Sequence, residues 1–327
     1  MILNKNAFAF VAILFNSFLF SQTDTATINF VDFNATATYG IGSGISVHFD
    51  PEGIYKFENQ GDDNQFVLEL SQPGGAFTPP IVLSTVEAFF TTTINGQIPA
   101  GTAAGSYNLR IRATKGILVD GTSFGEVLSV SSAAFDIVTT ASSQALFYSL
   151  IPPGQNLFDC TVEGVFDTNP MFGSLKMSSG DTSNDINELR RLLEISNHNV
   201  TKNYSLRRIN TETLSSVDLG TVAGSSYTIA NDLPIGTYNY ELEAEVGGIS
   251  SVYTAVFVLH KSTTVLANDT NENVCVGRDV EFNIDVSSDG IGLNYKGSYY
   301  ALDFGDNSPI KILTHADEKK IDTEFKR

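Results

Sequence analysis

Residues 98–113 read IPAGTAAGSYNLRIRA and residues 233–244 read LPIGTYNYELEA. Removal of a four-residue insertion from the first stretch aligns Pro with Pro, Gly-Thr with Gly-Thr, and Tyr107 with Tyr238. In each stretch Pro and Gly precede the tyrosine, which indicates a turn that leads into a strand. The two stretches are either a true internal repeat or a shared strand-entry pattern. The matching order of the residues favours the repeat.

Apolar and polar residues alternate after each tyrosine with the period of two that is typical of a strand. The positions predicted to face inward are Tyr107, Leu109, Ile111 and Ala113 in the first stretch and Tyr238, Tyr240, Leu242 and Ala244 in the second. Those predicted to face outward are Asn108, Arg110 and Arg112, and Asn239, Glu241 and Glu243. Both stretches are therefore predicted to be strands with one buried face.

Further short runs of this kind continue along the chain and are separated by Gly, Pro, Asn and Asp. Examples are FVLEL and EVLSVSS in the first third of the chain and YTIA and SVYTAVFVL in the second. Such spacing predicts an all-β protein built from tandem sandwiches. The expected units are 23–139, 140–260 and 261–327. One helix is expected between strands, at SNDINELRRLLEIS (183–196), where Ile186, Leu189 and Leu193 share a face.

The strand-entry tyrosines resemble the tyrosine corner of immunoglobulin-like sandwiches, in which a tyrosine at the start of a late strand bonds to nearby backbone. The position two residues later, a cysteine in antibody domains, is Leu109 or Tyr240 here, so the inter-sheet disulfide is absent. The two cysteines, Cys160 and Cys275, are interpreted as unrelated thiols. A bridge between them, or a partner for Cys275 beyond the chain, are the alternatives.

The N-terminus is a separate segment. Lys5 precedes an apolar run from Ala7 to Phe20, which is short for a membrane span and typical of a secretory signal peptide over 1–21. An uncleaved anchor is the alternative. We therefore expect an exported protein, secreted or at the cell surface, with no membrane span after cleavage. The formal net charge of −18 argues against nucleic acid as a partner.

Near the C-terminus the sequence YYALDFGDNSP (299–309) resembles the signature of PKD domains, which are extracellular β-sandwich modules. Leu302 and Asn307 depart from that signature. The resemblance implies that Phe304 packs inward, that Gly305 permits a tight turn, and that Asp303 and Asp306 accept hydrogen bonds from turn amides. With the repeat, it also implies similarity to the large modular surface proteins of gliding and biofilm-forming Bacteroidetes.

The PKD-like unit lacks its later strands, since the residues after His315 are charged and do not alternate. Half a sandwich cannot bury its sheet. We therefore expect the chain to be the N-terminal piece of a longer protein whose downstream domains are missing. A complete protein with a floppy tail over 261–327 is the alternative.

Candidate chemistry is sparse. Asp303, Asp306 and Asp289 could bind Ca²⁺ through oxygen ligands, although a metal-free turn is favoured. Ser123 lies in GTSFG, which matches a hydrolase elbow by letter, but a strand is expected to follow it, so it is interpreted as a hairpin-loop serine. No zinc-ligand spacing links the histidines, and YGIGSGIS (39–46) is interpreted as a bend between strands. The four histidines are His48, His198, His260 and His315, and the four Asn-x-Ser/Thr positions are Asn34, Asn199, Asn203 and Asn268.

These observations predict a non-catalytic exported modular protein, acting as a stalk or adhesive segment at a cell surface. Its partners would be glycans or other surface proteins, bound through weak multivalent contacts. The alternative is the accessory region of a secreted hydrolase such as a chitinase or protease, because PKD modules accompany such enzymes. No cofactor is expected beyond the Ca²⁺ considered above.

Overall fold

The computed structural model describes residues 26–57, 63–117, 123–141, 164–166, 175–176, 192–194, 203–223, 226–229, 233–234, 236–259, 265–268, 283–288, 291–292, 296–297, 299–302 and 310–314. Every regular element in these ranges is a strand, as the alternating runs predict. The fold class is all-β, with sheets packed against one another as sandwiches. The same ranges contain no helix long and apolar enough to cross a membrane.

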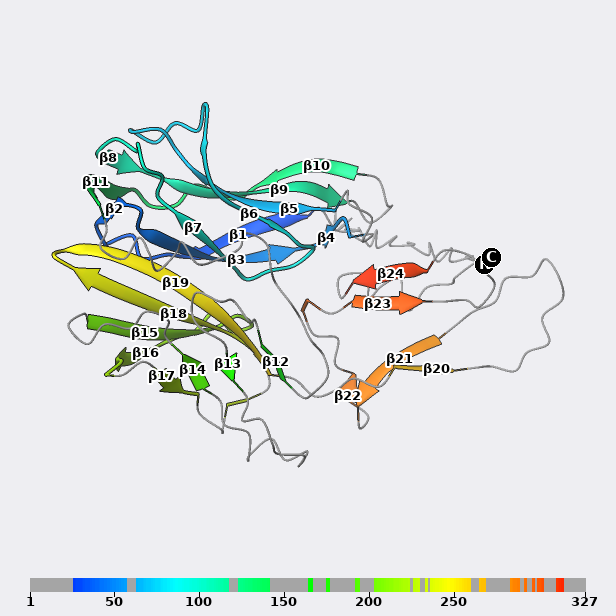
Figure 1. Ribbon diagram of the computed structural model, residues 1–327. Coiled ribbons are helices and arrows are strands. Elements are labelled where there is room, and N and C mark those ends of the chain that lie inside the picture. The colour runs from blue at the N-terminus through cyan, green and yellow to red at the C-terminus, as the bar shows by residue number, and fades with distance from the viewer. Residues whose placement is uncertain are drawn as a thin grey trace, which may run out of the picture.

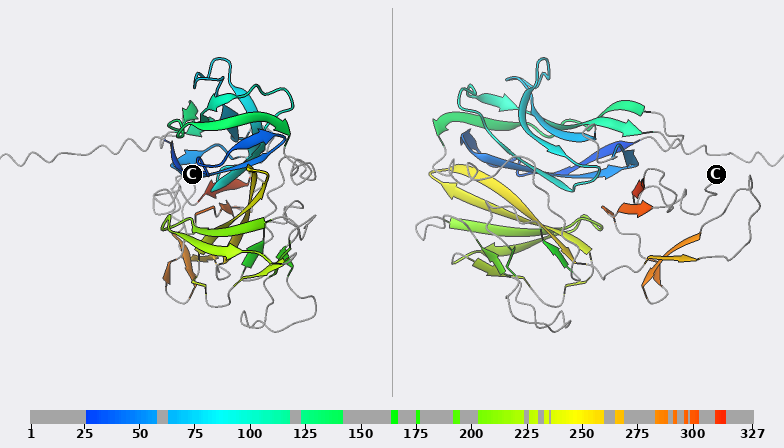
Figure 2. Two further views of the ribbon diagram at one scale, coloured as in Figure 1. Left: turned by 90° about the vertical axis from the view of Figure 1, so that its left-hand side faces the viewer. Right: turned by 45° about the vertical axis from the view of Figure 1, so that its right-hand side comes forward.

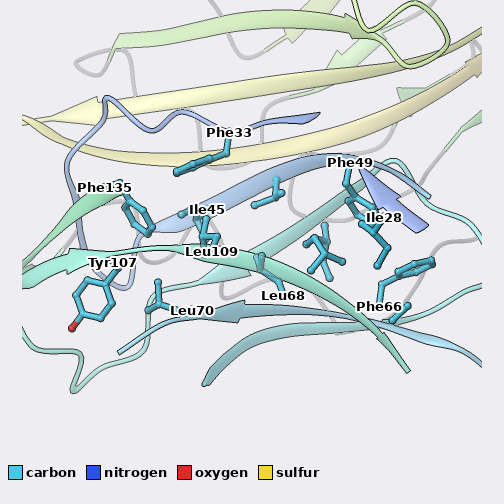
Figure 3. Close-up of a cluster of buried hydrophobic side chains, with 14 of the residues drawn as sticks. Ile28, Phe33, Ile45, Phe49, Phe66, Leu68, Leu70, Tyr107, Leu109 and Phe135 are labelled. Carbon is cyan, nitrogen blue, oxygen red and sulfur yellow. The ribbon is translucent and has the colours of Figure 1, made fainter. Parts of the chain in front are cut away.

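The first sandwich packs a three-stranded antiparallel sheet against a five-stranded one. The smaller sheet has the order β1 (Thr27–Asp32), β3 (Gly44–Glu52), β7 (Thr93–Gln97). The larger has the order β10 (Ser123–Leu128), β9 (Leu109–Ile117), β5 (Gln65–Leu70), β6 (Ile81–Glu87), with β4 (Ile54–Tyr55) paired to β9. Their inner faces enclose one apolar core, which includes Ile111. Figure 3 shows Ile28, Ile45, Phe49, Phe66 and Leu68 of this core.

The second sandwich is built around the strand order β16 (Ser216–Thr221), β15 (Asn203–Asn210), β18 (Gly236–Val246), β19 (Ile249–Leu259). A single parallel bridge, Ser250 to Tyr39, extends this sheet into the first sandwich. The extension has the order β2 (Tyr39–Ile41), β11 (Phe135–Ala141), β8 (Gly105–Tyr107), and β12 (Gly164–Phe166) also pairs with β19. The opposite sheet has the order β13 (Leu175–Lys176), β14 (Leu192–Glu194), β17 (Ser226–Thr228).

The sheets that carry the two repeated stretches have the same strand order. β6–β5–β9–β10 in the first sandwich corresponds to β16–β15–β18–β19 in the second, and the repeat lies on β8–β9 and on β18. Tyr107 pairs with Phe135, and Tyr238 pairs with Phe257. All eight positions predicted to face inward are buried. The sequence repeat therefore coincides with a repeat of structure.

The two sandwiches lie face to face. The sheets follow one another in the order β10–β9–β5–β6, β1–β3–β7, β16–β15–β18–β19 and β13–β14–β17 (Figures 1 and 2). The first and last pairs of layers enclose apolar cores. The middle contact, between β1–β3–β7 and β18–β19, carries the polar side chains described below.

Paired strands are also present in the third unit. β20 (Val265–Asn268) pairs with β21 (Asn283–Ser288), which pairs with β22 (Ile291–Gly292). β23 (Tyr299–Leu302) and β24 (Lys311–Thr314) are antiparallel, with Tyr299 opposite Thr314. These two strands flank the predicted acidic turn, but the turn itself, with Asp303, Phe304, Gly305 and Asp306, lies outside the described residues, as does Asp289.

Two expectations need correction and a third is confirmed. The expected helix is wrong at its end, because Leu192–Glu194 is strand β14, paired with β13 and β17; apolar spacing over a short run does not separate helix from strand. Ser123 is the first residue of β10, opposite Ile117, rather than a loop residue. The bend in the glycine-rich segment is confirmed, since Gly42, with φ 78°, lies between β2 and β3.

Candidate functional site: the polar seam between the sandwiches

Strand β3 is buried on both faces. Its alternate residues Ile45, Val47 and Phe49 enter the apolar core of the first sandwich. The residues between them, Ser46 and His48, are buried as well, at 0% and 1% exposure, on the opposite face. That second face is covered by β18 and β19 of the other sandwich. Because buried polar groups need partners, the side chains covering it must supply hydrogen bonds.

We call this contact the polar seam. On the first sandwich it comprises Ser46, His48, Thr92, Thr93 and Asn95, and on the second Asn239, Glu241, Ser251 and Thr254. The hydroxyls of Ser46 and Thr254 are 2.7 Å apart, and the Gly44 amide donates to Ser251 Oγ at 2.7 Å. Both sandwiches therefore contribute donors and acceptors to one network.

Asn95 binds the backbone of β19 in the way a neighbouring strand would. Its Nδ2 donates to the Thr254 carbonyl at 2.9 Å, and its Oδ1 accepts from the Thr254 amide at 2.9 Å. An amide side chain has one donor group and one acceptor group, so a single asparagine satisfies both backbone groups of Thr254. The edge of β19 between β12 and β2 is thus closed at this point by the other sandwich.

His48 lies at the centre of the seam. Its Nε2 is 2.7 Å from Glu241 Oε2, and its Nδ1 is 3.1 Å from Asn239 Nδ2. Glu241 and Asn239 were predicted to face outward; they do point away from their own core, but the first sandwich buries them, to 5% and 1% exposure. The alternation of apolar and polar residues predicts which face of a strand a residue occupies, but it does not predict whether another module covers that face.

Arg207, on β15, supplies the positive charge that faces the carboxylates at the seam. Its guanidinium contacts Glu241 Oε1 at 2.8 Å and Asp32 Oδ2 at 2.5 Å, so it links β18 to β1 across the seam. Burial alone would raise the pKa of Glu241, but the hydrogen bond from His48 and the ion pair with Arg207 outweigh burial and lower that pKa. The carboxylate is therefore held ionised in a buried position.

One of the four Asn-x-Ser/Thr positions, Asn34, lies at the rim of the seam. Asn34 Nδ2 donates to Glu243 Oε2 at 2.9 Å, and its Oδ1 accepts from the hydroxyl of Thr36 at 3.0 Å. Glu243 also accepts from Ser250 Oγ at 2.6 Å. The Asn34 amide is therefore engaged across the two sandwiches. Of the other three positions, Asn199 lies outside the described residues.

The two strand-entry tyrosines bond as a tyrosine corner does. Tyr107 Oη donates to the Ala103 carbonyl at 2.8 Å, and Tyr238 Oη donates to the Pro234 carbonyl at 2.6 Å, in both copies four residues upstream. Burial raises the pKa of both phenols, which keeps them protonated as donors. These residues anchor the turn before each repeated strand and take no part in the seam.

The seam also marks where the third unit reaches the first sandwich. Asp50, two residues after His48 on the same face of β3, accepts from Lys296 Nζ at 3.1 and 3.3 Å. A Cβ on the neighbouring Gly297 would lie 2.9 Å from the Phe90 ring, so the two segments are in close contact. The polar face of β3 therefore contacts both later units of the chain.

Among the sequence-predicted candidates that fall within the described residues, only His48 lies in this site, and sequence reasoning gave it no role. His198, His260, His315, Cys160 and Cys275 lie outside the described residues. Within the described ranges, no cluster of His, Cys, Asp and Glu side chains is arranged to hold a metal ion. One sequence signal could have pointed to the seam: the alternation in ISVHFD places a histidine between two apolar residues of a strand.

No protein-family model and no curated protein sequence matches the chain. Among solved structures, it is similar to the crystal structure of the FN1-FN3 domains of chicken CNTN1, fibronectin type III domains of a contactin. Sequence identity is 10% and the TM-score is 0.24; the match covers 73% of this chain and 66%, just under two thirds, of that one. The similarity concerns the fold class alone.

Proposed function

We propose that the protein is a non-catalytic, exported modular protein that serves as a stalk or adhesive segment of a cell-surface protein, in an adhesion, gliding or biofilm context. The observation that carries the proposal is the polar seam. It fixes two sandwiches face to face through buried hydrogen bonds and the Arg207 ion pairs with Asp32 and Glu241. Such a contact gives a stiff block in place of two freely moving modules.

The geometry favours the adhesive form of this proposal over the spacer form. An extended stalk gains length by joining modules end to end, whereas face-to-face packing gives thickness. A stiff, thick block presents its loops in a fixed arrangement, which lowers the entropy cost of binding through several weak contacts. The partners in this proposal are glycans or other surface proteins, and the third unit is a PKD-like module.

An immunoblot tests the location. An antibody raised against residues 26–259 would be applied to washed cells and to culture medium of the source organism. The proposal expects the protein on washed cells. A protein found only in the medium would contradict a surface segment and would favour the accessory region of a secreted hydrolase.

A competition assay tests adhesion. The purified full chain, added to the cells, is expected to lower their attachment to a coated surface. Glu241→Ala, which breaks the seam, is expected to compete less well, while Glu126→Gln on the outer face of the first sandwich serves as the matched control. Equal competition by all three proteins would show that adhesion does not depend on the seam. No competition by any of them would contradict the adhesive proposal.

A further inference from the structure

The two ring nitrogens of His48 face chemically different partners. Nε2 is 2.7 Å from a carboxylate oxygen of Glu241. An ionised carboxylate has no hydrogen to donate, so this oxygen can only accept a hydrogen bond. Nε2 must therefore carry a hydrogen. Nδ1 is 3.1 Å from Asn239 Nδ2, the nitrogen of a side-chain amide. What Nδ1 carries depends on which way that amide is turned.

Thr92 fixes the orientation of the Asn239 amide. Asn239 Nδ2 lies 3.2 Å from the Thr92 backbone carbonyl, and Asn239 Oδ1 accepts from the Thr92 hydroxyl at 2.9 Å. A carbonyl oxygen can only accept, so the atom facing it must be the NH₂ group. The second hydrogen of that group points to His48 Nδ1. Because Nδ1 faces a donor, it must accept and carries no hydrogen.

We infer that the polar seam holds His48 as a neutral imidazole with its hydrogen on Nε2, and that this arrangement makes the seam sensitive to acid. Protonation of Nδ1 would set one N–H against another. Relief requires the Asn239 amide to turn over, which places its oxygen against the Thr92 carbonyl and breaks that hydrogen bond. Protonation of His48 is therefore expected to loosen the contact between the sandwiches.

The opposing influence is the charge of Glu241, which favours an imidazolium. Arg207 already binds the other oxygen of that carboxylate, and this reduces the gain from a second cation. The seam residues on β7 and β19, namely Thr93, Asn95, Ser251 and Thr254, carry hydroxyls and amides. Glu241 is the titratable group in contact with the ring. The titratable groups on β3 and on the strands packed around it are Glu243 on β18, Arg207 on β15, Asp32 on β1, Tyr39 on β2, and Asp50 on β3, which binds Lys296 of the third unit.

The direct test is ¹⁵N NMR of the full chain, with the ring nitrogens of its four histidines labelled. The signals of His48 are those that disappear in His48→Gln. At pH 8 the expected signature is the neutral tautomer protonated on Nε2. As the pH falls toward 5.5, the Asn239 side-chain amide signals are expected to shift together with the His48 signals. A His48 ring that is protonated on Nδ1 at pH 8 would overturn the inference.

A reciprocal variant tests the role of the amide. Asn239→Asp replaces the donor by a carboxylate that can accept from a protonated Nδ1, so His48 should hold its second proton about tenfold more strongly. Asn108→Asp is the matched control, because Asn108 is the equivalent residue in the first sandwich and its Nδ2 donates to the Ser132 carbonyl instead. Unchanged titration of His48 in Asn239→Asp, or an equal change in Asn108→Asp, would overturn the inference.

Discussion

Strands β9 and β18 occupy equivalent places in the two sandwiches, and they carry the same cross-strand ion pair with its charges exchanged. In the first sandwich Arg110 on β9 is opposite Glu69 on β5. In the second Glu241 on β18 is opposite Arg207 on β15. When Tyr107 is aligned with Tyr238, Arg110 falls on Glu241.

The two faces differ in where the remaining charges find partners. On the first sandwich Arg110 and Arg112 both bind Glu69, and Arg112 also binds Glu126, so the face is satisfied from within its own sheet. On the second, Glu241 takes a further hydrogen bond from His48, and Arg207 a further ion pair with Asp32, both on the other sandwich. One strand arrangement can thus be a self-contained surface or a docking surface.

The largest effect expected from this comparison is the loss of Glu241. Glu241→Ala leaves Arg207 and the buried His48 without their carboxylate and should lower the free energy of unfolding by about 3–5 kcal/mol. Glu69→Ala should cost less, about 2 kcal/mol, because both of its partners, Arg110 and Arg112, keep 20% and 22% exposure to water, whereas the His48 side chain that Glu241 binds is 2% exposed. Urea unfolding of the full chain measures both. A greater loss in Glu69→Ala would contradict the proposed difference between the faces.

The second largest effect is expected from acid, which should reduce the stability that Glu241 provides to the seam. The pKa of Glu241 is lower in the folded chain than its ordinary value of 4.5, so the folded state binds fewer protons than the unfolded state. The stability from this group is complete above about pH 4.5 and is lost as the pH falls through the lower folded value. Melting temperatures between pH 6 and pH 3 should fall more steeply in the wild type than in Glu241→Gln. Parallel curves would contradict the ionised, buried carboxylate.

The tyrosine corners should respond equally. Tyr107→Phe and Tyr238→Phe each remove one hydroxyl that donates to a backbone carbonyl, and each should cost about 1 kcal/mol. Equal losses in urea unfolding would support equivalent roles in the two copies. A loss confined to one of them would show that the two copies share a structure but that only one hydroxyl contributes to the free energy of unfolding.

The smallest effect is expected at the edge of the first face. Glu126 is 62% exposed, and its ion pair within the described residues is with Arg112, which Glu69 also binds. Glu126→Gln should therefore change the free energy of unfolding by less than about 1 kcal/mol, since exposed ion pairs contribute little. A loss as large as that in Glu69→Ala would mean that the first face depends on this outer pair.

The sequence predicts the repeated strands well, because the alternation after Tyr107 and Tyr238 is local and has one period. It predicts the seam poorly. Ser46 and His48 alternate with apolar residues as any solvent-facing positions would, and their partners lie about two hundred residues away in the chain. At Leu192 and Leu193 the local pattern favours a helix, but pairing with β13 and β17 makes a strand.

The central claim is that the polar seam joins two sandwiches into one unit, and scanning calorimetry of paired core variants tests it most directly. Ile111→Ala opens the first core and Leu242→Ala the second, each at a cost of about 2–5 kcal/mol. If the seam couples the sandwiches, both variants should lower the temperature of the same unfolding transition. Two transitions, each shifted by only one of the variants, would show that the sandwiches unfold independently and would contradict the claim.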